Sequence, residues 1–150
     1  MFFCYLYKKR HMKHLFLFLS LFVFNYMFSQ SLSSLENEIL VVFKNHKMRL
    51  NGDLVKLNYD MSNSCREHSK LMATTGNFEH VDLSTVIGKS EIIQQNNNFM
   101  RTNKEVAKAV LDLFLTSPSH KYLLEDFSNE IGIGVYVDSE GLVWVTVRFL

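Results

Sequence analysis

Apolar residues recur at helical spacing in three segments of the chain, near residues 34–48, 60–75 and 103–116. Side chains three and four positions apart lie on one face of a helix, so each segment predicts a helix with a buried stripe. Ser33 and Glu36, three positions apart, are typical of a capping box at the start of the first helix. The pattern therefore predicts three principal helices.

The ends of the later helices carry residues that suit those positions. Asp60 is a natural N-cap for the second helix, and Gly76 can adopt the left-handed conformation that ends it. Pro118 prevents the third helix from continuing and suits the first position of a short fourth helix.

The C-terminal part of the chain predicts a β-hairpin. Residues 131–137 and 142–149 are rich in β-branched and aromatic residues, and residues 138–141 suit a turn between them. Both strands are almost continuously apolar, which is typical of a sheet covered on both faces. Gly132 and Gly134 indicate close backbone packing rather than a phosphate loop, because no helix follows them.

The segment between the second and third helices, residues 77–102, predicts mostly irregular structure. Within it, residues 91–94 favour a short strand, and the polar tract at residues 94–98 favours a surface loop.

The first 29 residues predict a signal peptide. Four basic residues between positions 8 and 13 precede the apolar run from Leu15 to Phe28, and a polar exit follows at residues 29–31. Spanning a bilayer needs about 20 apolar residues, so this shorter run favours a secretory signal. An uncleaved anchor is the alternative, and either Met1 or Met12 suits the start of the signal. We therefore expect a secreted protein, extracellular or periplasmic, that contacts the membrane only through this segment.

Residues 30–150 then predict one domain of ordinary size. Removal of four of the 16 Lys and Arg residues leaves 12 against 15 Asp and Glu residues, a net charge near −3. This charge argues against a nucleic-acid partner, which requires a basic surface. Cys65 is the only cysteine left, so no internal disulfide is expected, and its helical spacing with Met61 and Met72 predicts a small buried side chain.

Two histidines and a carboxylate, His80, Glu91 and His120, are candidates for one cleft, because each lies next to the edge of an apolar element. Such groups can hold zinc or transfer protons near neutral pH, and spacing alone favours neither use. Each also has a structural interpretation: His80 as a loop cap, His120 as a partner of the short helix backbone, and Glu91 as an exposed residue at a strand edge. His68, on the buried face of the second helix, predicts a structural histidine.

Ser117 and Ser119 are close to His120 in sequence, yet they do not predict a serine hydrolase. Neighbouring residues at a helix start point in different directions, and the chain has no nucleophile-elbow pattern.

The order and spacing of several motifs resemble the CAP superfamily, also called the SCP domain, in its small bacterial secreted branch. The resemblance covers about residues 36–150. Its motifs are a helix with His68-Ser69 and Met72, then Phe78-Glu79-His80, Ser90-Glu91-Ile92-Ile93, Phe114 to His120, Ile131-Gly132-Ile133-Gly134 and Val145 to Phe149.

The resemblance implies an α+β fold, a three-layer α-β-α sandwich with a small, largely antiparallel sheet. It also implies a cleft lined by His80, Glu91 and His120, with Ser117 where eukaryotic members have a second glutamate. Zinc is the candidate metal at His80 and His120, with Glu91 as a weaker ligand. The departure of Ser90 from the glycine of the family's Gly-Glu-Asn-Ile motif weakens the catalytic interpretation.

We therefore expect a monomeric secreted binding module. Its cleft would take a small ligand, a lipid or a metal ion, or contact an extracellular macromolecule. A metal-assisted extracellular hydrolase, similar to a protease, is the alternative.

Overall fold

The computed structural model describes residues 32–52, 54–97, 102–126 and 129–150. The predicted signal peptide, residues 1–29, lies outside the described residues. Among the helices described, none is long and apolar enough to cross a membrane.

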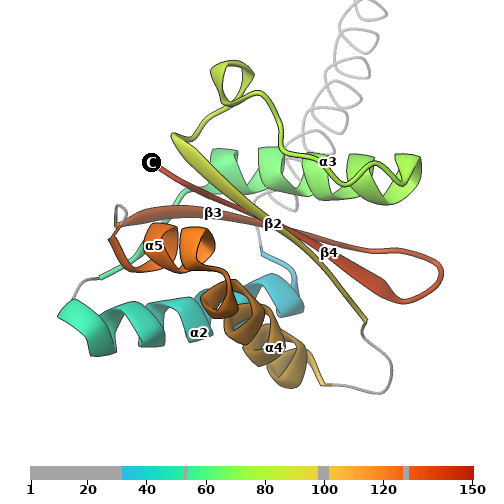
Figure 1. The fold of residues 1–150 in the computed structure, drawn as a ribbon. Helices are drawn as coiled ribbons and strands as arrows, with labels where there is room; N and C mark the ends of the chain where they lie inside the picture. Colours follow the sequence, from blue (N-terminus) through green and yellow to red (C-terminus); the bar gives the residue numbers. More distant parts are fainter. Residues whose placement is uncertain (1–31, 53, 98–101, 127–128) are drawn as a thin grey trace, which may run out of the picture. The chain divides into compact units, whose positions relative to one another are not determined.

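A four-stranded sheet, in the order β1-β3-β4-β2, forms the middle layer of the fold (Figure 1). β1 (Lys56–Leu57) pairs in parallel with β3 (Glu130–Val137). β3 and β4 (Leu142–Phe149) form an antiparallel hairpin, and β4 also pairs antiparallel with β2 (Ser90–Asn97). The C-terminal hairpin therefore lies at the centre of a largely antiparallel sheet, as predicted.

Helices cover both faces of this sheet (Figure 1). α3 (Tyr59–Thr75) packs against β3 and β4 on one face. On the other face lie α2 (Ser34–Asn51), α4 (Asn103–Thr116) and α5 (Pro118–Asp126). The main core joins these three helices to the sheet through buried residues that include Ile39, Phe43, Val106, Val110, Phe114, Val145 and Val147. The predicted α+β, three-layer α-β-α sandwich is confirmed.

Hydrogen bonds at the helix ends follow the sequence prediction in most places. Ser33 and Glu36 form the predicted capping box of α2. Gly76 ends α3 in the left-handed conformation, with φ of 70°. The prediction of Asp60 as the N-cap of α3 is wrong, because Asn58 accepts from the backbone of Met61 in that role. Both Asn and Asp suit the N-cap position. The helix therefore starts two residues earlier than predicted, with the same kind of capping hydrogen bond.

Gly134 on β3 allows α3 to approach the sheet closely, which confirms the prediction of close backbone packing. A Cβ atom at Gly134 would collide with the backbone of Cys65 and Arg66, and one at Gly132 would collide with Met61. Ser69 Oγ donates to the carbonyl of Gly134 at 3.0 Å. This contact fixes the α3 residues that face the candidate site.

The sequence prediction is wrong for the segment after Glu91. The strand was expected to end at residue 94, whereas β2 continues to Asn97 and pairs along its whole length with β4. Gln94 is buried there, opposite Val145. The tract resembles a loop in composition, but backbone pairing with a central strand overrides its low β-propensity. A short 3-10 helix, η1 (Leu83–Thr85), precedes this strand.

Candidate functional site

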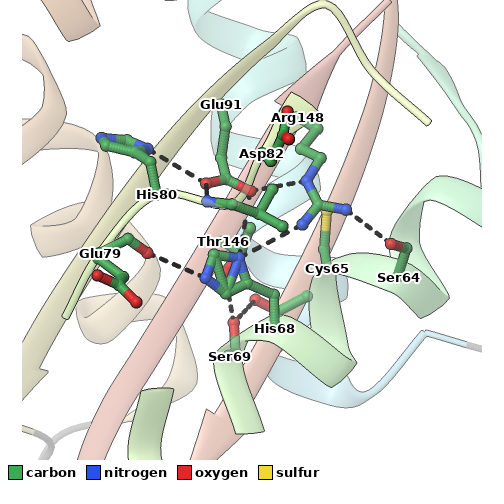
Figure 2. A network of polar contacts seen from close by, with 12 residues as sticks. Ser64, Cys65, His68, Ser69, Glu79, His80, Asp82, Glu91, Thr146 and Arg148 are labelled. Atoms are coloured by element: carbon green, nitrogen blue, oxygen red, sulfur yellow. Dashed lines mark hydrogen bonds and ion pairs between the residues drawn. The ribbon is translucent and has the colours of Figure 1, made fainter. Parts of the chain in front are cut away.

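Glu91 lies near the start of β2, and its side chain is only 1% exposed. Oε2 accepts from Arg148 Nε at 2.7 Å and lies 3.3 Å from His68 Nδ1. Oε1 accepts from the backbone N–H of Val81 at 3.1 Å and lies 3.2 Å from His80 Nδ1 (Figure 2). The buried Glu91 carboxylate therefore connects the loop after α3 to the sheet through its contacts. Its interpretation as an exposed residue at a strand edge is wrong.

Arg148 stands opposite Glu91 in the β2–β4 register and has no exposed side-chain surface. Its Nη1 donates to Ser64 Oγ at 2.7 Å, and its Nη2 lies 3.4 Å from His68 Nδ1. A buried charge is tolerated only with an opposite charge and hydrogen-bond partners beside it, and Arg148 has both. The guanidinium balances the charge of Glu91 and leaves that carboxylate little freedom.

His68 is a buried, hydrogen-bonded histidine, as predicted. Nε2 lies 3.0 Å from the carbonyl oxygen of Glu79. Because a carbonyl only accepts, Nε2 carries the proton and Nδ1 presents a lone pair toward Arg148. Burial is the main effect that lowers the pKa of His68, Arg148 also lowers it, and Glu91 opposes them. His68 is therefore a neutral imidazole that supports both the loop and the Glu91–Arg148 pair.

His80 is the member of this network that reaches solvent, with 55% of its side chain exposed. Its Nδ1 faces Glu91 Oε1 at 3.2 Å. Since an ionised carboxylate only accepts, this contact places a proton on Nδ1, and in the neutral ring it leaves the lone pair on Nε2. Carboxylates commonly orient metal-binding or catalytic histidines in this way. Glu91 thus holds His80 in one tautomer and one orientation.

His120 lies in the first turn of α5, with its ring against Phe114 at a centroid separation of 5.6 Å and an interplanar angle of 88°. Burial lowers the pKa of His120, and the charge of His80 lowers it further. The effect on His120 favours a neutral ring with a free lone pair at neutral pH.

The other candidates do not complete a three-ligand metal site. Among the residues described, no three His, Cys, Asp or Glu side chains are grouped closely enough to hold a metal ion. Glu91 already faces Arg148 and His80, so it does not fit as a direct ligand. Ser117 follows α4 as its C-cap, with its Oγ 3.1 Å from Ser119 Oγ. A metal ion here would depend on the two imidazoles and on water or a bound ligand.

Sequence reasoning missed Arg148, although the sequence contains a usable signal. Arg148 interrupts the apolar strand Val143–Phe149, in which the neighbouring positions are buried. A strand covered on both faces gives a charged side chain no solvent, so such an arginine requires a buried carboxylate partner. Glu91 is the partner that the structure places opposite it.

No protein-family model matches the sequence, and no curated protein matches it. Several solved structures match its fold. NaASP2, solved with Zn²⁺, aligns with a TM-score of 0.60 and 10% identity over 78% of this chain and 80% of the other. An outer surface protein from Borrelia burgdorferi aligns with a TM-score of 0.58 and 14% identity, covering 78% of this chain and 94% of the other.

An extracellular protein with an SCP domain from Bacillus anthracis aligns with a TM-score of 0.56 and 19% identity. That match covers 77% of this chain and 40% of the Bacillus protein. At these identities the likeness concerns the fold and not the activity. The layers, the central hairpin and these structural matches together show that the chain has the fold of the CAP superfamily, the SCP domain.

Proposed function

We propose that this protein is an exported binding module, and that the imidazoles of His80 and His120 are its ligand-contacting groups. This proposal rests on the hydrogen bonds that the Glu91 carboxylate already forms within the protein. Both of its oxygens face protein donors, with Arg148 Nε at 2.7 Å from one and the backbone N–H of Val81 at 3.1 Å from the other. Glu91 therefore positions His80 and does not itself meet a ligand.

The alternative, a metal-assisted hydrolase with a carboxylate as its base, requires a carboxylate that is free to take a proton from water. Glu91 is the only candidate carboxylate, and it is buried beside a guanidinium. Ser117 Oγ and Ser119 Oγ lie 3.1 Å apart, and among the described residues neither hydroxyl forms a hydrogen bond with a histidine base. These contacts favour binding over catalysis.

Zinc is the first ligand to test, because imidazole nitrogens ligate zinc and NaASP2, which has the same fold, has been solved with Zn²⁺. The imidazoles of His80 and His120, each in its neutral form, would hold the ion, which could in turn accept a small ligand in its remaining positions. Zinc would add stability through binding to the folded state alone.

The test is a zinc titration followed by thermal unfolding and calorimetry. We expect zinc to raise the melting temperature of the wild-type protein and His80→Ala plus His120→Ala to abolish the increase. His46→Ala is the matched control, since His46 lies on α2 beside Glu125 and outside the cleft. No zinc-dependent change, or an unchanged response in the double variant, would refute the metal-binding form of the proposal.

The export proposal has its own test. We expect mass spectrometry of the exported protein to find a chain without residues 1–29. Recovery of the full-length chain in the membrane fraction would contradict cleavage and favour an anchor instead.

A further inference from the structure

The segment that carries His80 has no regular structure of its own. Residues 76–82 connect α3 to η1 without helix or strand, and residues 76–80 are exposed. An exposed segment of this kind opens at little cost in free energy unless contacts with the rest of the fold hold it. The orientation of the His80 imidazole therefore depends on the contacts of residues 78–81.

The backbone is held on both sides of His80. On one side, the carbonyl oxygen of Glu79 accepts from Nε2 of His68 at 3.0 Å. On the other side, the N–H of Val81 donates to Oε1 of Glu91 at 3.1 Å, and the His80 ring faces the same oxygen (Figure 2). Loss of the His68 contact would leave the chain held on one side only.

The guanidinium of Arg148 supports both of these backbone contacts. Its Nε donates to Glu91 at 2.7 Å, and its Nη2 lies 3.4 Å from Nδ1 of His68. A donor that faces Nδ1 keeps the proton of the neutral His68 ring on Nε2, the nitrogen that contacts Glu79. His68 therefore links the buried arginine to the residue before His80, and Glu91 links it to the ring.

Phe78 adds an apolar contact at the start of the segment. Its ring lies 6.2 Å from that of Trp144, at an interplanar angle of 54°, and Phe78 remains 49% exposed. Trp144 is itself fixed, because it is buried and its Nε1 donates to Asp138 at 2.9 Å. Two aromatic rings in such an arrangement stabilise each other beyond the area that they bury. The contact thus holds the chain two residues before His80.

We propose that His68 and Phe78 are positioning residues for the ligand-contacting imidazole of His80. His68 acts through the carbonyl of Glu79, and Phe78 acts through its ring contact with the sheet. With Glu91, they hold His80 in the orientation that leaves Nε2 toward solvent. A side chain held in place before binding loses less conformational entropy when a ligand arrives, which raises the affinity. This inference rests on the proposed function, since it assigns both residues to the same site.

Calorimetric titration with zinc measures the effect on affinity. His68→Leu removes the donor to Glu79 and should weaken zinc binding roughly tenfold, the lower end of the cost of losing a group that orients a metal-binding histidine. His68→Gln keeps a donor and should retain most of the affinity. Phe78→Ala should weaken binding roughly two- to tenfold, the factor that corresponds to one aromatic pair. Wild-type affinity in both His68→Leu and Phe78→Ala would overturn the proposal.

Two NMR measurements on the zinc-free protein test the positioning role without relying on the proposed function. Long-range ¹H–¹⁵N correlation at alkaline pH reports the tautomer of His80, and hydrogen exchange reports the hydrogen bond of the Val81 amide. We expect a single Nδ1–H tautomer and a protected amide in the wild type. His68→Leu and Phe78→Ala should give a mixture of tautomers and lose the protection, and His68→Gln should retain both features.

The two sets of measurements separate the two proposals. Failure of the wild type to bind zinc would count against the proposed function, and the NMR measurements would still decide the positioning role. An unchanged tautomer and unchanged exchange in both variants would refute the positioning role, whether or not zinc binds. Because Phe78 is half exposed, Phe78→Ala keeps the test decisive if His68→Leu does not fold.

Val110→Ala is the control for general loss of stability. Val110 is buried in the main core, on α4 and on the face of the sheet opposite α3. Its truncation should lower the melting temperature and leave the His80 tautomer and the Val81 exchange as they are in the wild type. Changes in Val110→Ala as large as those in His68→Leu would assign the effect to general destabilisation and refute the proposal.

Discussion

Arg148 and Glu91 face each other across the β4–β2 pair, and their side chains meet at 2.7 Å with no more than 1% of either exposed. The pair joins a central strand to an edge strand. Through Glu91 it also holds the backbone of Val81 and the ring of His80. A buried ion pair thus sets the position of the exposed histidine.

Replacing Arg148 with methionine should destabilise the protein by about 3–5 kcal/mol, because the carboxylate of Glu91 would remain buried without its counter-charge. Urea unfolding measures this change. Arg49→Met is the control, since Arg49 is exposed in the last turn of α2 and its loss should cost within about 0.5 kcal/mol. Equal stability of the two variants would show that the buried pair is dispensable.

Glu91→Gln should weaken zinc binding at His80 by roughly 10- to 100-fold, the usual effect of losing the group that orients a metal-binding histidine. This prediction rests on the proposed function. Calorimetric titration of a variant that is shown by circular dichroism to be folded provides the measurement. An affinity equal to that of the wild type would mean that Glu91 supports the loop alone.

Stability should decrease as the pH falls below 6.5, the ordinary pKa of histidine. Burial lowers the pKa of His68 in the folded state, Arg148 and His80 add to this effect, and Glu91 opposes it. As the pH is lowered, the unfolded chain therefore takes up a proton before the folded chain does. The free energy of unfolding decreases as the pH decreases, until the pH reaches the lowered pKa of the folded state. Well above pH 6.5 both states are neutral at this residue, so it contributes no pH dependence there.

Urea unfolding at pH 7.5 and pH 5.5 tests this linkage. His68→Gln should reduce the difference between the two pH values, because glutamine has no proton to gain in this range. It still offers a donor to the carbonyl of Glu79, which His68 Nε2 contacts at 3.0 Å. An unchanged pH difference in this variant would assign the effect to other groups.

Gly134→Ala should lower stability by about 1–3 kcal/mol or more, since the new methyl group would collide with the backbone of Cys65 and Arg66 rather than with a movable side chain. Thermal unfolding measures the loss. Ser139→Ala, on the exposed turn after β3, is the neutral control. A melting temperature like that of the wild type would mean that α3 moves away from β3 at little cost.

Local rules predicted most of the fold. The capping box at Ser33, the left-handed Gly76 and the turn before β4 depend on residues close together in sequence, and the structure contains all three. The polar end of β2 could not be predicted in this way. Asn97 is in a strand only because Leu142 pairs with it from a distant part of the chain.

The candidate site was predicted in part. The order of motifs led to His80, Glu91 and His120, but it could not show that the Glu91 carboxylate forms an ion pair with another side chain. That fact depends on the register that places Arg148 opposite Glu91, and register is a tertiary property. The sequence thus indicates candidate residues, while their contacts, and the part played by Arg148, follow from the structure.

Cys65 is an internal reporter of the separation of α3 from the sheet. The thiol is fully buried between α3 and β3, its Sγ lies 3.7 Å from the carbonyl oxygen of Gly132, and burial raises its pKa to about 12. The thiolate is the form that attacks alkylating reagents, and at such a pKa it is scarce and screened from solvent. The rate at which Cys65 becomes labelled therefore measures how often α3 separates from the sheet, in the native protein and without any engineered probe.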